Sequence, residues 1–125
     1  MELTKNEQEI MDVLFREGRP LSRTEIVKLS VDKSWKDSSI HILLNSLLKK
    51  GAIREAGFIK TGRSYGRIFE PTETSEDYYA ELLANAAKKT SLPLFLSKLF
   101  NSQDIGKETI QELESIINKK KRDLE

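Results

Sequence analysis

The chain contains no cysteine, one histidine and three prolines among its 125 residues. Without cysteine it can form no disulfide, no thiolate metal site and no cysteine nucleophile, and this composition suits a reducing cytoplasm. A single histidine also removes most catalytic bases and zinc sites, and no glycine motif of the kind that cradles phosphates is present. We therefore expect that the protein is not an enzyme and that it holds neither a cofactor nor a metal.

Long apolar segments are missing as well. No apolar run approaches the roughly 18 residues that a membrane helix needs, and the opening MELTKNEQEI lacks the basic and then apolar pattern of a signal peptide. We expect a soluble, cytoplasmic protein without membrane insertion. With 38% hydrophobic residues the chain can bury a core, but a chain this short often shares its core with a partner subunit, so a homodimer is a reasonable expectation.

Charge is nearly balanced over the whole chain, at a formal +1, but it is unevenly distributed. Residues 1–72 carry 13 basic and 10 acidic side chains, and residues 73–125 carry 8 basic and 10 acidic ones. Within residues 36–67, seven basic residues face two acidic ones. A phosphate-binding surface needs such local concentration rather than a high total charge, so this stretch is the first candidate for nucleic-acid binding.

Two capping boxes predict the first two helices. Thr4 with Glu7 predicts a helix over 5–17, which Gly18 ends, and Ser22 with Glu25 predicts a short second helix that ends near residue 30. In each box the hydroxyl and the carboxylate satisfy each other's backbone amides.

A third helix is predicted over 38–50, before Gly51. Ile40, Leu43, Leu44 and Leu47 recur at the i, i+3, i+4, i+7 spacing of one apolar helix face, which we assign to the core. β-Branched and aromatic residues then flank a glycine-rich turn from Thr61 to Gly66, which predicts a β-hairpin over 52–71 with a basic tip.

Three helical segments follow from Thr74 onward, separate from the first core. The expected fold is therefore mainly α with a small β-hairpin: a winged helix-turn-helix over 1–72 and a helical dimerisation region over 73–125. In that fold the third helix enters the major groove and the hairpin, or wing, reaches the DNA backbone. These same two segments also collect the basic residues.

The candidate DNA-binding residues lie on the polar face of the third helix, along the basic segment that follows it, and at the start of the second helix, whose amides could hold a phosphate. They are Ser22, Arg23, Thr24, Ser38, Ser39, His41, Ile42, Asn45, Ser46, Lys49, Lys50, Arg54, Arg63 and Arg67. Taken singly, each basic residue could equally be solvated surface.

Ile42 and Asn45 suggest an A·T-rich half-site. A thymine methyl would cover Ile42 in the major groove, and Asn45 can make a bidentate contact to adenine. The alternative is that Ile42 packs under the wing or a neighbouring helix. Trp35, placed just before the third helix, is predicted to lie in the core.

The block Trp35 to Ile53, WKDSSIHILLNSLLKKGAI, resembles the penicillinase-repressor family of winged-helix regulators, which includes the beta-lactamase and methicillin-resistance repressors. Further matches are the opening LTKNEQEIMDVLF, the wing with Gly62, Arg63 and Tyr65, and the C-terminal LSKLFNSQDIGKETIQELESI. The order and spacing of these segments together are what carry the resemblance, which runs almost from end to end.

The resemblance implies a cytoplasmic homodimeric repressor that binds double-stranded DNA at a palindromic operator, with the C-terminal helices forming the dimer interface. The candidate dimerisation residues are the apolar positions of those helices: Tyr78, Leu82, Leu83, Leu96, Leu99, Ile110, Leu113, Ile116 and Ile117.

The resemblance also brings two ways of sensing a signal. Copper sensing through a Cys-x-Cys pair is excluded because the chain has no cysteine. The beta-lactam-responsive members are inactivated by a sensor-linked protease, commonly at an Asn-Phe bond. The matching stretch SKLFNSQD has Lys98 and Leu99 at that bond, so the inducing signal stays open.

A function from another class also fits the basic surface. A winged helix can act as a protein-interaction module, and its basic face would then bind an acidic protein instead of DNA.

Overall fold

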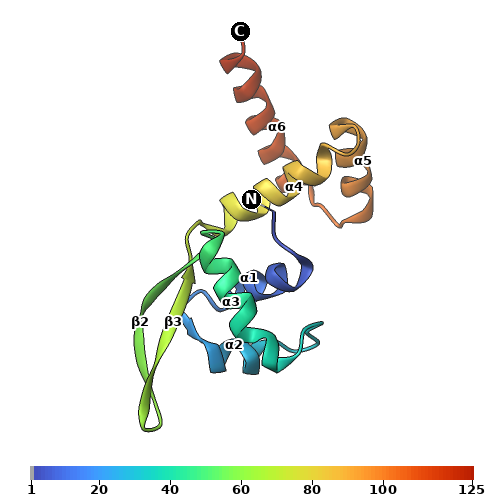
Figure 1. The fold of residues 1–125 in the computed structure, drawn as a ribbon. Coiled ribbons are helices and arrows are strands. Elements are labelled where there is room, and N and C mark those ends of the chain that lie inside the picture. Colours follow the sequence, from blue (N-terminus) through green and yellow to red (C-terminus); the bar gives the residue numbers. More distant parts are fainter. Residues whose placement is uncertain (1) are drawn as a thin grey trace. The chain divides into compact units, whose positions relative to one another are not determined.

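The computed structural model describes residues 2–125 (Figure 1). The elements follow one another as α1 (Lys5–Glu17), β1 (Leu21–Ser22), α2 (Arg23–Leu29), the 3₁₀ turn η1 (Asp37–Ser39), α3 (Ile40–Lys49), β2 (Ile53–Thr61), β3 (Ser64–Pro71), α4 (Ser75–Ala87), α5 (Leu92–Ser102) and α6 (Lys107–Asp123). The predicted fold class, mainly α with a β-hairpin wing, is confirmed.

Both predicted capping boxes are present. The amide of Glu7 donates to Thr4 Oγ1 at 3.2 Å, and the amide of Thr4 donates to Glu7 Oε1 at 2.8 Å. α1 ends at Gly18, whose φ of +66° is the left-handed conformation that favours glycine. Ser22 and Glu25 form the same box at the start of α2, so both helices begin where the sequence predicts.

The third predicted helix begins as a tight turn. Residues 37–39 form η1, and regular α-helix runs only from Ile40 to Lys49. Ile40, Leu44 and Leu47 are buried, as their spacing predicts, and Leu43 is half-buried against the same core.

The sheet is antiparallel in the order β1-β3-β2, with the long β2–β3 hairpin forming the wing (Figure 1). Pairing extends to Thr61 and Ser64, so the turn consists only of Gly62 and Arg63, shorter than the predicted Thr61–Gly66. Strand pairing reaches into the glycine-rich segment because Gly62, at φ +64°, supplies the positive φ that a two-residue turn needs. Strand β1 was not expected, because two residues carry no periodic signal.

One core joins α1, α2, α3 and the base of the sheet. Its members are apolar and almost completely buried: Ile10, Met11, Val13, Leu14, Leu21, Ile26, Trp35, Ile40, Leu44, Leu47, Ala52, Ile53 and Phe69. The prediction that Trp35 lies in the core is confirmed.

The chain divides into two compact units, the first ending at Tyr79 and the second spanning 80–125. The first unit extends seven residues past the predicted boundary because the start of α4 packs on α1. The rings of Phe15 and Tyr78 lie 5.1 Å apart, and Tyr79 donates a hydrogen bond to Asp12 at 2.5 Å. Burial, with Asp12 and Glu7 nearby, raises the pKa of Tyr78 to about 12.

The second unit contains the rest of α4, all of α5 and all of α6. Ala87 is its only buried residue. Across residues 2–125, no helix is both long enough and apolar enough to cross a membrane.

Candidate nucleic-acid interface

The face of α3 opposite its buried stripe is open to solvent. His41, Ile42, Asn45 and Lys49 are exposed, and Ile42 is 73% exposed. Ile42 therefore does not pack under the wing or a neighbouring helix, which removes the alternative considered for it. Ser38 is exposed and Ser39 half-buried in the turn before α3.

His41 is held by α2. Arg23 Nη1 lies 2.5 Å from His41 Nε2, and because a guanidinium can only donate, Nε2 is the acceptor in this contact. This contact connects the start of α2 to the first turn of α3.

A hollow of about 310 Å³ lies beside this pair. Its walls come from the start of α2, from α3 and from β3: Ser22, Arg23, Thr24, His41, Leu44, Ser64, Tyr65, Gly66, Arg67 and Phe69. Polar and basic side chains from three elements thus surround one concave surface, which is the geometry that a DNA backbone can enter.

The wing carries both paired and unpaired cations. Arg67 pairs with Glu55 at 2.5 Å and stacks over Phe69, with 5.1 Å from its guanidinium carbon to the ring centre. Arg54 pairs with Glu70 at 3.1 Å. Arg63 occupies the exposed turn, and no ion pair found among residues 2–125 includes it. Lys60 of β2 is exposed and likewise takes part in no ion pair found among these residues, so the unpaired positive charges of the wing lie at and beside its tip.

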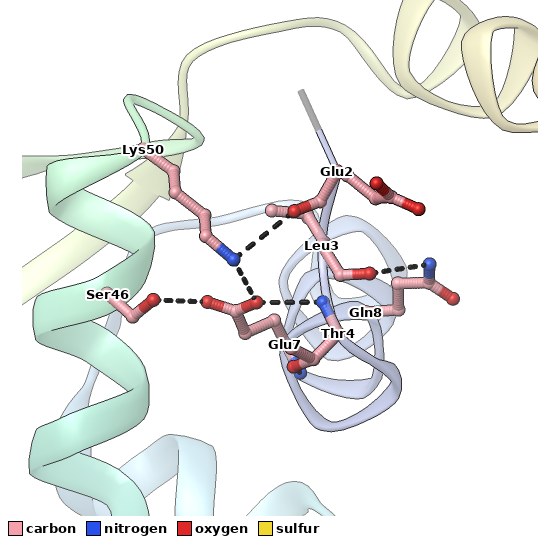
Figure 2. A network of polar contacts seen from close by, with 7 residues as sticks. All are labelled: Glu2, Leu3, Thr4, Glu7, Gln8, Ser46 and Lys50. Carbon is pink, nitrogen blue, oxygen red and sulfur yellow. Dashed lines mark hydrogen bonds and ion pairs between the residues drawn. The ribbon is translucent and has the colours of Figure 1, made fainter.

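Three residues that were predicted to contact DNA instead bind other residues of the same chain. Ser22 is 3% exposed and its hydroxyl accepts from the amide of Glu25, so this side chain serves as a helix cap. Ser46 donates to Glu7 Oε2 at 2.6 Å, and Lys50 donates to Glu7 Oε1 at 2.7 Å (Figure 2). The contacts of Ser46 and Lys50 could not be predicted from local spacing, because Glu7 lies 39 and 43 residues earlier in the chain.

Glu7 is the buried centre of this network. Burial alone would raise its pKa, but hydrogen bonds from Lys50, Ser46 and Thr4 outweigh that effect and lower the pKa to about 2. The carboxylate is therefore ionised at neutral pH, although only 1% of the residue is exposed.

No cluster of three or more metal-ligating side chains occurs within residues 2–125. The arrangement thus consists of an exposed polar helix face, a hollow beside it and a basic wing. The family model described as "Penicillinase repressor" matches residues 3–119. The chain belongs to the penicillinase repressor family.

Similar proteins include the methicillin resistance regulatory protein MecI of Staphylococcus aureus (strain N315), which is 24% identical over 122 residues covering 95% of each chain. A 16.5 kDa protein of Latilactobacillus sakei, described as lying in the ptsI 3′ region, is 34% identical over 87 residues covering 70% of this chain and 53% of that protein.

Two similar solved structures are a repressor matched over nearly the whole chain at low identity and a regulator matched over little more than half of it. The adhesin competence repressor AdcR of Streptococcus pyogenes has a TM-score of 0.46 at 16% identity, over 98% of this chain and 81% of that chain. The ferric uptake regulator Fur of Helicobacter pylori has a TM-score of 0.42 at 33% identity, over 57% of this chain and 46% of that chain.

Membership of the penicillinase repressor family makes the chain a DNA-binding transcriptional repressor and not an enzyme. The geometry described above, with α3 open beside a basic wing, is consistent with this activity.

One exposed side chain on the hollow is not among the residues predicted to contact DNA. Tyr65 is 72% exposed and lines the hollow together with His41 and Arg67. The available signal was strand alternation, since residues 65, 67 and 69 of β3 share one face.

Most predicted dimerisation residues lie open or half-buried in the second unit. Leu83, Ile116 and Ile117 are 51%, 65% and 53% exposed. Half-buried positions are Leu82, Leu96, Leu99, Ile110 and Leu113. Tyr78 differs, because its ring packs on Phe15 of the same chain and belongs to the edge of the first core.

Proposed function

We propose that this repressor binds a palindromic operator as a homodimer, with α3 in the major groove and the wing over residues 52–71 on the backbone. The observation that carries the proposal is the solvent-exposed polar face of α3, bordered by the basic wing and by Arg23. The residues proposed to contact DNA are Arg23, Thr24, Ser38, Ser39, His41, Ile42, Asn45, Lys49, Arg54, Arg63, Arg67 and Tyr65.

The homodimer is supported by the apolar side chains of the second unit. α6 buries no residue in the single chain, yet Ile110, Leu113 and Ile117 repeat at helical spacing along it. An exposed apolar stripe of this kind favours association, and a two-fold dimer would present two α3 helices to two half-sites.

The half-site is proposed to be A·T-rich, because Ile42 and Asn45 suit thymine methyls and adenine edges. Binding to DNA would place the protein in the cytoplasm. The similarity to methicillin resistance regulators suggests a related regulatory role, with a sensor-linked protease as a further partner. The residues at Lys98 and Leu99 do not supply the Asn-Phe bond that such cleavage commonly uses.

A salt series distinguishes DNA binding from binding to an acidic protein. Operator candidates are first enriched from a random duplex pool with the purified protein, and their affinity is then measured at increasing salt. We expect log affinity to fall linearly with log salt, with a slope of about −0.9 for each phosphate neutralised. Failure to enrich any sequence, with tight binding to an acidic protein, would favour the interaction module.

A further inference from the structure

Glu7 lies in the first turn of α1 but holds the last turn of α3 (Figure 2). Its Oε2 accepts from Ser46 Oγ at 2.6 Å, and its Oε1 accepts from Lys50 Nζ at 2.7 Å and from the Thr4 amide at 2.8 Å. Lys50 also donates to the carbonyl of Glu2 at 3.2 Å. One carboxylate thus joins the start of α1 to the end of α3.

Apart from the Arg23–His41 contact at its first turn, the contacts that otherwise hold α3 have little directional preference. Ile40, Leu44 and Leu47 pack by apolar burial, which depends on area more than on angle. A buried carboxylate, by contrast, is tolerated only when donors meet it at close distances and suitable angles. The Glu7 network therefore restricts the rotation and sliding of α3 in a way that apolar packing does not.

Ser46 and Lys50 also lie next to the exposed face of α3. At 100° per residue, both lie on one side of the direction of Ile42, Asn45 and Lys49. A small rotation of the helix at Ser46 would accordingly redirect those three side chains.

We propose that Glu7 is a positioning residue that sets the orientation in which α3 presents Ile42 and Asn45 to base edges. Glu7 itself touches no DNA, and Lys50 serves Glu7 instead of a phosphate. This inference rests on the proposed function, because it assigns a role in sequence-specific binding.

Lys50 could instead contact a DNA phosphate, and the two roles of Lys50 predict opposite effects of Glu7→Gln on DNA affinity. If Lys50 is a phosphate anchor that Glu7 restrains, removing the charge of Glu7 raises affinity for all DNA. If Glu7 positions α3, the same substitution lowers operator affinity and does not lower affinity for random duplex. The ratio of the two affinities therefore distinguishes the assignments.

The experiment compares the full-length wild type, Glu7→Gln and the matched control Glu25→Gln on the enriched operator and on a random duplex of equal length. Glu25 occupies the same capping-box position in α2 and pairs with Arg19 at 2.8 Å, and its side-chain contacts include no residue of α3. We expect the operator-to-random ratio to fall about tenfold in Glu7→Gln, the size of one lost base contact, and to change little in Glu25→Gln. An unchanged or raised ratio in Glu7→Gln would overturn the proposal.

Lys50→Met tests the other half of the network. We expect a lower operator affinity with the same salt slope as the wild type. A slope smaller by about 0.9 would assign Lys50 to a phosphate and refute its role as the partner of Glu7.

Two further measurements guard against simple loss of folding. Ser46→Ala removes one hydroxyl and keeps the ion pair, so it should lower the ratio in the same direction but by less. Hydrogen exchange on the free proteins should be faster at the amides of residues 46–50 in Glu7→Gln than in Glu25→Gln. If the wild type enriches no sequence, the proposed function fails; if it does and Glu7→Gln keeps the ratio, only this inference fails.

Discussion

At the scale of single residues, Glu7 combines tasks that are usually separate. The same side chain completes the capping box of α1, pairs with Lys50 and accepts from Ser46. Because all three contacts are stronger to the ionised form, the stability of the protein depends on the charge of this one group.

This dependence predicts a pH effect with a definite sign. The pKa of Glu7 is lowered from 4.5 to about 2 in the folded protein, so its stabilisation is present above pH 4.5 and is lost as the pH falls toward 2. The loss should amount to about 3 kcal/mol of unfolding free energy. Urea unfolding of the wild type and Glu7→Gln, measured from pH 6 to pH 2.5, should show a difference that shrinks in this window; a constant difference would contradict it.

Ile42 is the residue at which exposure itself suggests a partner. Replacing Ile42 by Ser should weaken operator binding by about 1 to 3 kcal/mol, the contribution of one base contact, while leaving binding to random duplex nearly unchanged. Val31→Ser is a suitable control because Val31 is also β-branched, is 77% exposed and lies outside α3. Equal losses of affinity for the operator and for random duplex would contradict a contact between Ile42 and a thymine methyl.

At the scale of elements, local signals account for most of the helix boundaries. The capping boxes and Gly18 place α1 and α2 because each interaction joins residues within four positions of one another. The wing was predicted as a hairpin, but its short turn and the strand β1 were not. The turn is short because Gly62 lets β2 and β3 pair as far as Thr61 and Ser64, and β1 depends on pairing between β3 and residues 21–22, far earlier in the chain.

The wing offers a comparison between a free and a paired arginine. Arg63→Ala should reduce the salt slope by about 0.9 and weaken binding to operator and random DNA alike, because a phosphate contact carries no sequence information. Arg54→Ala should change the slope less, since Glu70 already lies 3.1 Å from Arg54. Fluorescence anisotropy over a salt series measures both slopes, and a larger effect at Arg54 would reverse this assignment.

At the scale of the whole molecule, the two units differ in how many of their apolar side chains they bury. The first unit contains the entire large core, whereas in the second only Ala87 is buried. Many exposed apolar side chains on one unit are typical of a protein–protein interface. Tyr78 belongs to the first unit, which leaves α5, α6 and the rest of α4 as the proposed dimerisation surface.

A charge placed on that surface should separate the subunits. Ile117→Asp should weaken dimerisation more than about a hundredfold, because an unpaired carboxylate would be buried in an apolar interface, and full-operator binding should weaken with it. Ser115→Asp adds the same charge on the other side of α6, where the hydroxyl of Ser115 donates to the carbonyl of Gln111 at 3.2 Å. Sedimentation velocity gives the oligomeric state, and an intact Ile117→Asp dimer with full affinity would refute the placement.

Taken by itself, the sequence determined the features that rest on near neighbours in the chain: the capped helices, the apolar stripe of α3, the basic hairpin and the exclusion of thiol chemistry. Tertiary structure alone decided which polar side chains already have hydrogen-bond or ion-pair partners within the protein. Ser46 and Lys50 meet Glu7 across 39 and 43 residues, and Tyr65 shares a hollow with His41 on another element. Such contacts follow from how the elements pack on one core, and no spacing within a single segment encodes them.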